Sequence, residues 1–288
     1  MQTARAIVLL FIFVTVTLVL MPWQASAVRF GLKRRKTFPH RFHKFLCRLF
    51  GIRVRTIGTP IQGKGVLMVS NHTSYFDILT LSSVARVSFV AKNEVAGWPF
   101  FGSLARLQET IFISRDRRAK TGEARDQIRE RLLAGDALVL FAEGTSDDGN
   151  RVLPFKSALM GAAEAIMGRD ASGHDVHVPV QPVSISYVGL HGLPMGRENR
   201  ALFAWYGDME LVPHLWEAMK AGPIDVVIEF HPPLDIDQAG GRKELAQLAE
   251  AAVRRGQARA LAGAASDARP AFAAKPAVAA ETLVRQPA

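Results

Sequence analysis

A histidine and an aspartate that follow an apolar run could together perform acid–base chemistry. The run Val66–Ser70 precedes His72, and Asp77 lies five positions further along the chain. On one continuous helix, residues five apart point about 140° away from each other. The two side chains can therefore meet only if His72 lies in a loop and a helix begins near Ser74. An aspartate bonded to one ring nitrogen would fix the imidazole tautomer and leave the other nitrogen as a base.

The same spacing also fits a purely structural interpretation. Ser74 and Asp77 are three positions apart, as in a helix capping box, and His72 would then be an ordinary loop residue. The spacing alone favours this structural interpretation, so the choice depends on what lies elsewhere in the chain.

A second polar segment follows another apolar run. Ala137–Phe141 is followed by Ala142-Glu143-Gly144-Thr145-Ser146, which supplies a carboxylate, a flexible backbone and a hydroxyl. Alone this signal is weak, because Gly and Thr are common loop residues. Together with the histidine and aspartate segment, it favours the catalytic interpretation.

Four ordered segments resemble those of the lysophosphatidate acyltransferases and related glycerolipid acyltransferases. The resemblance covers roughly residues 66–187, and Lys92 to Gly102 also resembles the family's stretch between the first two segments. Four segments in the family's order argue against chance. They are His72 with Asp77, then Phe112-Ile113-Ser114-Arg115, then Phe141 to Ser146 continuing to Leu153-Pro154-Phe155-Lys156, and finally Val178-Pro179-Val180-Gln181-Pro182-Val183.

The resemblance implies a role for each of these residues. His72 would take the proton from an acceptor hydroxyl as that hydroxyl attacks the carbonyl of an acyl thioester, and Asp77 would orient and stabilise the imidazolium. Arg115 would bind the anionic head of the acceptor, since a guanidinium can form paired bonds with phosphate or carboxylate. The remaining substrate-binding candidates are Glu143, Gly144, Thr145 and Lys92.

One departure from the family pattern bears on the acceptor. Ser146 stands where members usually carry an Arg near the acceptor phosphate, and Arg151 or Lys156 could supply the missing cation. With His191-Gly-Leu-Pro-Met-Gly and Ala204-Trp-Tyr-Gly-Asp208, the chain also resembles the branch that acylates lyso-ornithine lipid. Lysophosphatidate and lyso-ornithine lipid both remain open as acceptors. Acyl-CoA and acyl carrier protein both remain open as donors.

Other classes of chemistry have little support in the sequence. The seven remaining histidines among the eight in the chain show no metal-ligand spacing. A Gly-rich phosphate loop of the Walker or dinucleotide type is missing. We therefore expect no metal and no cofactor beyond the acyl-CoA or acyl carrier protein co-substrate. A secreted hydrolase is disfavoured, because a Gly-x-Ser-x-Gly elbow is missing. A catalytically silent, membrane-anchored lipid-binding protein is the alternative, and intact His72 and Asp77 count against it.

Apolar runs and helical stretches alternate along the chain. The helical stretches include Ala124–Leu133 and Ser157–Met167. This alternation predicts an α/β fold with a mostly parallel sheet flanked by helices, as in glycerolipid acyltransferases, with functional loops at the carboxyl ends of strands. The predicted strands are Val66–Ser70, Val87–Ala91, Ile111–Ile113, Ala137–Phe141, Val180–Tyr187, Ala201–Tyr206 and Val226–Phe230.

The N-terminal segment is predicted to be a membrane helix. Residues 6–28 contain no charged side chain, and about 20 apolar residues suffice to cross a bilayer. Ala25-Ser26-Ala27 leaves open a cleaved secretory signal. Basic residues beside a membrane segment tend to stay cytoplasmic, and five of them follow at once: Arg29, Lys33, Arg34, Arg35 and Lys36. We therefore expect a catalytic domain at the cytoplasmic face of the inner membrane.

Positive charge is concentrated in the first 76 residues. This stretch holds 12 Lys or Arg and no Asp or Glu, whereas the remainder holds 24 basic and 26 acidic side chains. One-sided charge indicates an anionic partner, and beside an apolar segment membrane phospholipid fits better than nucleic acid. Residues 38–50 form a basic amphipathic pattern that suits the membrane interface, or packing of the apolar side on the core, or both.

These observations predict four parts of the chain. A membrane helix spans residues 1–28, a basic amphipathic segment spans 29–55, and a catalytic domain spans 56–242. Residues 243–288 are predicted to form a short helix and then an Ala/Pro-rich tail, whose composition is typical of disorder. The single cysteine, Cys47, excludes an internal disulfide.

Overall fold

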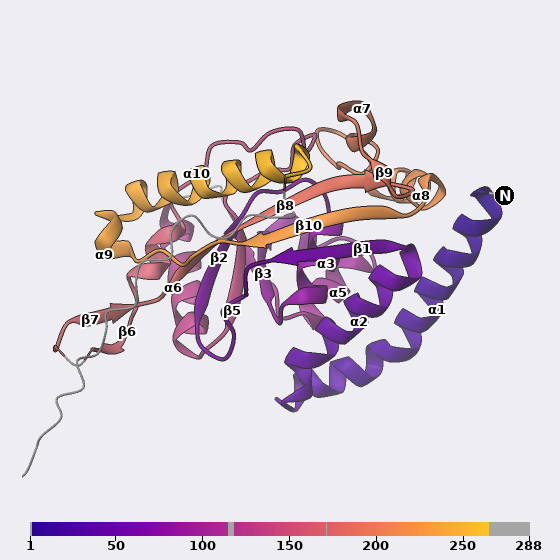
Figure 1. The fold of residues 1–288 in the computed structure, drawn as a ribbon. Helices are drawn as coiled ribbons and strands as arrows, with labels where there is room; N and C mark the ends of the chain where they lie inside the picture. The colour runs from indigo at the N-terminus through magenta and orange to yellow at the C-terminus, as the bar shows by residue number, and fades with distance from the viewer. Residues whose placement is uncertain (1, 115–117, 171, 265–288) are drawn as a thin grey trace, which may run out of the picture.

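A mostly parallel β-sheet forms the centre of the computed structural model, which describes residues 2–114, 118–170 and 172–264 (Figure 1). Its strand order is β1-β10-β8-β2-β5-β3-β4, with β9 paired to β8. The β10–β8 and β8–β9 pairs are antiparallel and the other pairs are parallel. The strands are β1 (Ile52–Ile57), β2 (Val66–Ser70), β3 (Ser88–Lys92), β4 (Ile111–Ile113), β5 (Ala137–Phe141), β8 (Val180–Leu190), β9 (Leu193–Pro194) and β10 (Ile224–Phe230).

Side chains of the central strand β2 alternate between two apolar cores. Val66 and Met68 face one core, whereas Leu67 and Val69 face the other, and all four are fully buried. This period of two is expected for a strand covered on both faces. Helices therefore cover both faces of the sheet, as predicted.

The helices form two groups, one on each face of the sheet. One face is covered by α6 (Arg118–Leu133), the 3-10 turn η1 (Met160–Glu164) and α10 (Arg242–Leu261). The other face is covered by α1 (Gln2–Arg29), α2 (Arg34–Phe50), α3 (Phe76–Val84), α5 (Phe101–Leu107) and α8 (Leu211–Ala221) (Figure 1). The short helices are α4 (Asn93–Ala96), α7 (Arg197–Arg200) and α9 (Ile236–Ala239), and β6 (Ile166–Arg169) pairs with β7 (Asp175–His177) outside the main sheet.

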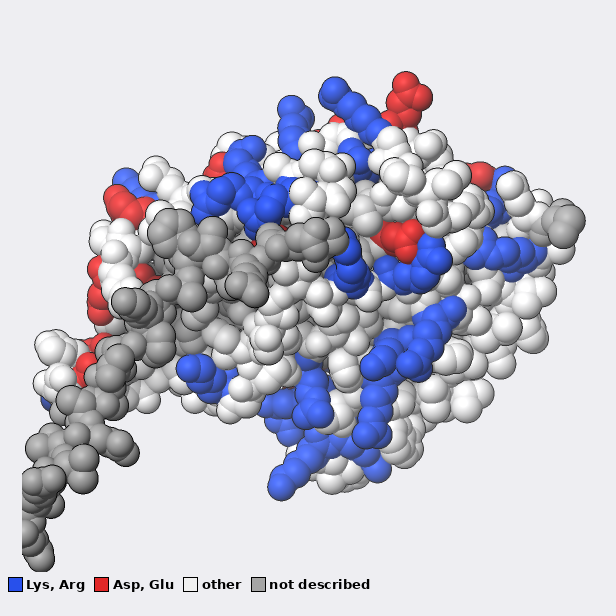
Figure 2. Space-filling model, viewed as in Figure 1, with Lys and Arg blue, Asp and Glu red and all other residues white. Residues whose placement is uncertain are grey.

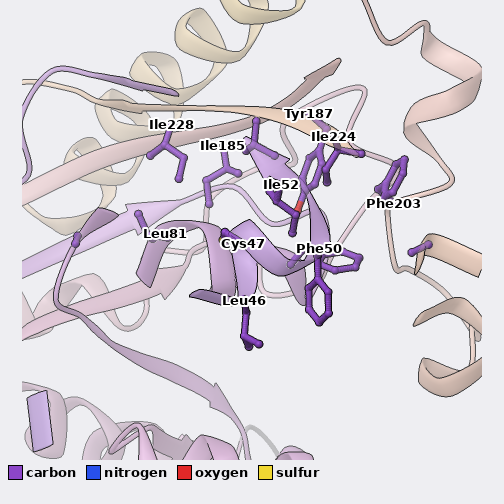
Figure 3. Close-up of a cluster of buried hydrophobic side chains, with 14 of the residues drawn as sticks. Leu46, Cys47, Phe50, Ile52, Leu81, Ile185, Tyr187, Phe203, Ile224 and Ile228 are labelled. Atoms are coloured by element: carbon purple, nitrogen blue, oxygen red, sulfur yellow. The ribbon is translucent and has the colours of Figure 1, made fainter. Parts of the chain in front are cut away.

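Helix α2 packs its apolar side on the sheet. Leu46, Cys47 and Phe50 are buried in one cluster with Ile185 of β8 and Ile224 of β10 (Figure 3). Burying each large apolar side chain contributes roughly 1.5–3 kcal/mol. Packing on the core, one of the two interpretations of residues 38–50, is therefore confirmed, and the basic side of the helix remains exposed.

Helix α1 is attached to the domain at both ends. Arg5 donates to two backbone carbonyls at one end (3.1 and 3.3 Å), and Gln24 donates to two others near the far end (3.0 and 2.9 Å). Between these residues, Ala6, Leu9 and Phe13 are buried against the domain. Although α1 is long and apolar enough to cross a membrane, it lies along the side of the domain (Figure 1).

Two predicted elements are wrong. Ala201–Tyr206 is a turn rather than a strand, because the backbone N–H of Trp205 donates to the carbonyl of Thr73 (2.9 Å) instead of joining the sheet. The predicted helix Ser157–Met167 is only the 3-10 turn η1, after which the chain enters β6.

Strand β1 was not predicted, and it crosses the boundary placed between residues 55 and 56. Arg53 and Arg55 are exposed on β1, so its sequence is only half apolar and resembles the basic segment before it. At the other end, α10 accounts for the helix expected after residue 243. The predicted tail falls mainly on residues 265–288, which lie outside the described residues.

Candidate active site

His72 and Asp77 meet at the carboxyl end of β2. His72 follows the strand by two residues, and Asp77 lies in the first turn of α3, so the helix begins after the histidine. Nδ1 of His72 lies 2.8 Å from Oδ2 of Asp77. Because the chain changes from loop to helix between His72 and Asp77, the two side chains can make a contact that a continuous helix would prevent.

The Asp77 carboxylate is fully buried and accepts bonds from four groups. Besides His72, Oδ2 accepts from the backbone N–H groups of Thr73 (2.7 Å) and Ser74 (2.9 Å), and Oδ1 accepts from the hydroxyl of Tyr187 (2.7 Å). The bond from the Ser74 N–H matches the capping interpretation of the spacing. Asp77 therefore holds the backbone before α3 and the imidazole at the same time. A buried carboxylate needs donors of this kind to satisfy its oxygens.

Nε2, the ring nitrogen of His72 that does not contact Asp77, is the atom that can accept a proton. With Nδ1 donating to Asp77, the lone pair lies on Nε2. Nε2 has no hydrogen-bond partner among the described residues, and the side chain is 19% exposed. The imidazole stacks on the ring of Phe141 with centroids 4.0 Å apart, which fixes the plane of the ring. The pair can therefore act as a general base toward a hydroxyl placed at Nε2.

Glu143 holds the backbone of the loop of residues 71–74, which carries His72 and is named the catalytic loop for its proposed role. Its side chain is 2% exposed and accepts bonds from the N–H groups of His72 (2.8 Å) and Leu153 (2.7 Å). Burial raises the pKa of Glu143 to about 8, against the lowering effect of these two donors. Glu143, which was predicted to bind substrate, therefore holds the backbone of His72 in place.

Gly144 borders a small pocket at the carboxyl ends of β4 and β5. The residue has a φ of 75°, in the left-handed region that favours glycine. Together with Ser114 and the exposed Lys156, it lines a pocket of about 210 Å³. Arg115, the residue predicted to bind the anionic head, follows Ser114 directly and lies outside the described residues.

The last two predicted residues lie at the surface. Lys92 is the final residue of β3, at the same sheet edge as His72, and its side chain is exposed. Thr145 is also exposed and donates only to the carbonyl of Ser146 (3.4 Å) among the described residues. The fold thus joins His72 to both Asp77 and Glu143 through hydrogen bonds, and Gly144 follows Glu143 directly. Lys92 and Thr145 are exposed to solvent.

Sequence reasoning does not single out Tyr187, although its hydroxyl contacts Asp77. The residue is buried in β8, and burial raises the pKa of its hydroxyl well above the usual value, so the group remains a donor. The sequence signal that could have indicated a role for Tyr187 is its place at the end of an apolar run, because a buried tyrosine hydroxyl needs a hydrogen-bond partner. That signal does not reveal which residue is the partner.

Comparison with known proteins gives a consistent result. The Acyltransferase family model matches residues 51–186. A lyso-ornithine lipid O-acyltransferase of Brucella abortus is 48% identical over 254 residues, covering 88% of this chain and 93% of that protein. The chain belongs to the acyltransferase family.

More distant acyltransferases share the family relationship. A 1-acyl-sn-glycerol-3-phosphate acyltransferase of Neisseria gonorrhoeae is 28% identical over 195 residues, covering 68% of this chain and 70% of that protein. The crystal structure of a 1-acyl-sn-glycerophosphate acyltransferase from Thermotoga maritima has a TM-score of 0.61 and 24% identity, covering 89% of this chain and 96% of that chain. The acyltransferase fold predicted from the sequence is therefore confirmed.

In this acyltransferase, Ser146 joins three segments around the active site. Its hydroxyl donates to the carbonyl of Trp205, and the N–H of Trp205 donates to the carbonyl of Thr73 (2.9 Å). The loop after β5, the turn after α7 and the catalytic loop are thereby linked. An arginine at position 146 would lose the bond from the serine hydroxyl to the Trp205 carbonyl. Ser146 therefore has a structural partner of its own.

An apolar cavity of about 190 Å³ connects α1 with the catalytic loop. Its walls extend from Phe13 and Leu20 of α1 to Tyr75 beside the catalytic loop and to Phe89 of β3. The ring of Phe89 stacks on Phe141 with centroids 6.0 Å apart, and Phe141 in turn stacks on His72. One wall of the cavity is therefore linked to the imidazole through the stacked rings of Phe89 and Phe141.

The acyltransferase has one thiol, and it faces the core. Cys47 is buried in α2, and its Sγ contacts the carbonyl of Leu79 (3.7 Å). Burial raises the pKa of this thiol to about 11, which keeps it protonated and a poor nucleophile. Across the described ranges, no group of three or more His, Cys, Asp or Glu side chains is placed to hold a metal ion.

Proposed function

We propose that this acyltransferase transfers a fatty acyl group from a thioester to the hydroxyl of a lysolipid, with His72 as the general base. The observation that carries the proposal is the Nδ1–Oδ2 contact of 2.8 Å between His72 and buried Asp77, with Nε2 left open. The 48% identity to a lyso-ornithine lipid O-acyltransferase favours lyso-ornithine lipid as the acceptor. Lysophosphatidate is the second candidate, supported by the relative at 28% identity.

The proposed reaction needs no covalent enzyme intermediate. The acceptor hydroxyl gives its proton to Nε2 of His72 while its oxygen forms the new bond to the thioester carbonyl carbon. The negative charge of Asp77 stabilises the imidazolium that results. The tetrahedral intermediate then breaks its carbon–sulfur bond, and the departing sulfur takes the proton from Nε2. The products are the acylated lipid and the free thiol of the donor.

The apolar cavity is the proposed site for an acyl chain. Its lining is mostly apolar and includes Phe89, whose ring stacks on the Phe141 ring beside His72. Transfer of apolar surface from water contributes roughly 0.8 kcal/mol per buried CH₂ group, which would favour entry of part of an acyl chain. Both acyl-CoA and acyl carrier protein present the same thioester, and either could deliver it.

Helix α1 and the basic turn after it are the proposed membrane contacts. Large apolar side chains project from α1 away from the domain, among them Phe11 and Val19, which are each 70% exposed. Figure 2 shows Lys and Arg gathered at the lower edge of the molecule, over the turn between α1 and α2. Apolar side chains beside a basic patch suit a surface of anionic phospholipid.

The attachment of α1 bears on how it meets the bilayer. Because Arg5 and Gln24 bind the domain at the two ends of the helix, a fully crossing α1 would carry charged domain surface into the hydrocarbon. We therefore infer that α1 lies within one leaflet, with the catalytic domain on the cytoplasmic side of the inner membrane. The basic residues after α1 support that orientation.

A transfer assay in vesicles tests the proposed function. The purified protein is given lyso-ornithine lipid or lysophosphatidate as acceptor, and acyl-CoA or acyl carrier protein as donor. The expected result is ester formation with lyso-ornithine lipid, at a higher catalytic efficiency than with lysophosphatidate. Absence of transfer to both acceptors with both donors would overturn the proposal.

A further inference from the structure

A second polar pocket adjoins the catalytic loop on the side of α7. It has a volume of about 410 Å³ and is lined by Asp148, Asn150, Arg151, Arg197 and Arg200. Its walls come from the loop after β5 and from the two ends of α7. None of these residues belongs to the four segments that resemble other acyltransferases.

Arg200 is the most unusual residue of this pocket. It is only 6% exposed, and its guanidinium donates to the carbonyls of Tyr187 (3.2 Å) and Met195 (3.1 Å) and to the side chain of Asn150. Within the described part of the chain, no carboxylate lies within 4.0 Å of this guanidinium. Buried arginines are normally paired with an anion. The neutral partners fix the direction of the guanidinium and leave its charge without a direct counter-ion.

The pocket lies against the catalytic loop. The N–H of Asp147 donates to the carbonyl of His72 (3.2 Å), so the loop that carries Asp148 and Arg151 is bonded to the backbone of His72. Gly149 packs so closely that a Cβ atom there would lie 2.8 Å from Thr73. Tyr187 also joins the two regions, because its hydroxyl contacts Asp77 while its carbonyl accepts from Arg200.

Charges of both signs line the pocket, with one aspartate among three arginines. Arg197 is exposed on α7, and Arg151 pairs with Asp147 (2.7 Å), whereas Asp148 is bonded by the backbone and side chain of Asn150 (2.9 and 3.0 Å). Because Arg151 is paired with Asp147, the remaining charges of the pocket belong to Arg197, Arg200 and Asp148. This combination complements a head that carries one carboxylate and one ammonium group, because each charge finds a partner of opposite sign.

We propose that this pocket binds the head group of a zwitterionic acceptor, with Arg197 and Arg200 facing its carboxylate and Asp148 facing its ammonium. An ornithine head carries these two groups. The proposal rests on the proposed lysolipid acyltransferase function and names the residues that would select the head. It also explains how the chain could dispense with an arginine at position 146.

The test compares two acceptors that differ only at the carboxylate. Lyso-ornithine lipid and its carboxylate methyl ester are assayed in vesicles with the wild type, Arg197→Ala and Arg169→Ala. Arg169 is the control, because it is an exposed arginine on β6, away from the pocket. We expect the wild type to prefer the free acid, and Arg197→Ala to reduce that preference about tenfold, the effect of losing one charge-assisted bond. Asp148→Asn should raise the acceptor KM for both compounds, since both keep the ammonium, while Arg169→Ala changes neither.

Three results would overturn the head-group site. Equal losses with acid and ester in Arg197→Ala would indicate a structural role. A raised KM for the acyl donor, with the acceptor preference intact, would assign the pocket to the donor's phosphates instead. A wild type that does not distinguish acid from ester would show that the carboxylate is not bound. Absence of transfer by the wild type to any lysolipid is a different outcome, because it overturns the proposed function itself.

Discussion

The hydroxyl of Tyr187 donates a 2.7 Å hydrogen bond to Oδ1 of Asp77, the carboxylate oxygen that does not accept from His72. The two residues are 110 positions apart in the chain. Strand β8 therefore fixes the carboxylate at the start of α3, so the orientation of the imidazole depends on the central sheet as well as on the local loop.

Asp77→Asn should remove the charge that stabilises the imidazolium. An asparagine can still accept from Thr73 and Ser74 through its oxygen, so the loop should keep its shape. We expect kcat/KM to fall by about 10²–10⁴-fold, the usual scale of general-base catalysis, with little change in Tm. Tyr187→Phe is the matched comparison: it removes one donor to the same carboxylate and should cost about tenfold or less. Near-normal turnover in Asp77→Asn would show that the carboxylate serves only as a helix cap.

Glu143→Gln tests the protonation of the buried carboxyl group behind the catalytic loop. Burial raises the pKa of Glu143 from 4.5 to about 8. Between these values the folded protein keeps a proton that the unfolded chain has released, so the free energy of unfolding falls as pH rises, by up to about 1.4 kcal/mol per pH unit. The glutamine does not titrate. The stability of the wild type minus that of the variant should therefore fall across this window.

Thermal unfolding in detergent at a series of pH values measures that difference. A difference that stays constant, or rises with pH, would mean that Glu143 is ionised throughout the window and that its two N–H donors outweigh burial.

Ser146→Arg should move the acceptor preference toward lysophosphatidate. One arginine–phosphate contact contributes about 1.5–3 kcal/mol, which corresponds to roughly ten- to hundredfold in the ratio of catalytic efficiencies. Because the Ser146 hydroxyl bonds the Trp205 carbonyl, Ser146→Ala is the control for loss of that link alone. If both variants shift the ratio equally, the link to Trp205 sets the preference. If neither shifts it, position 146 does not select the head group.

Helix α1 should remain part of the mature protein. Ala25-Ser26-Ala27 lies inside the last turns of α1, where Ala27 is fully buried and Gln24 bonds the domain. Cleavage there would remove one wall of the apolar cavity. Mass spectrometry of protein extracted from membranes should therefore detect the N-terminal peptide. A mature chain that begins at Val28 would establish the secretory signal instead.

Much of the sheet could be predicted from the sequence, because its inner strands are buried on both faces. Val66–Ser70 and Ala137–Phe141 are continuous apolar runs, and both are strands with the expected bounds. Strand β1 was missed because it lies at an edge and exposes two arginines. The segment Ala201–Tyr206 is apolar enough for a strand, but its bonds go to the active-site loops, which a local pattern cannot reveal.

The candidate site was predictable only where its residues are close in sequence. His72 and Asp77 could be paired from their spacing, once the helix start between them was inferred. The contacts of Asp77 with Tyr187 and of Arg200 with Asn150 depend on how the strands and loops pack, over separations of 110 and 50 residues. Glu143 was chosen for its place after a strand, whereas its bond to the His72 backbone follows from the parallel pairing of β2 with β5.

The role of His72 as the base is tested most directly by His72→Ala, assayed for transfer to lyso-ornithine lipid in vesicles beside the wild type. His174→Ala is the matched control, because His174 is exposed between β6 and β7 and also faces an aspartate, Asp170. We predict that His72→Ala lowers kcat/KM by about 10²–10⁴-fold while Tm and membrane binding are retained, and that His174→Ala stays at the wild-type rate. Turnover by folded His72→Ala within a few-fold of the wild type would contradict the mechanism.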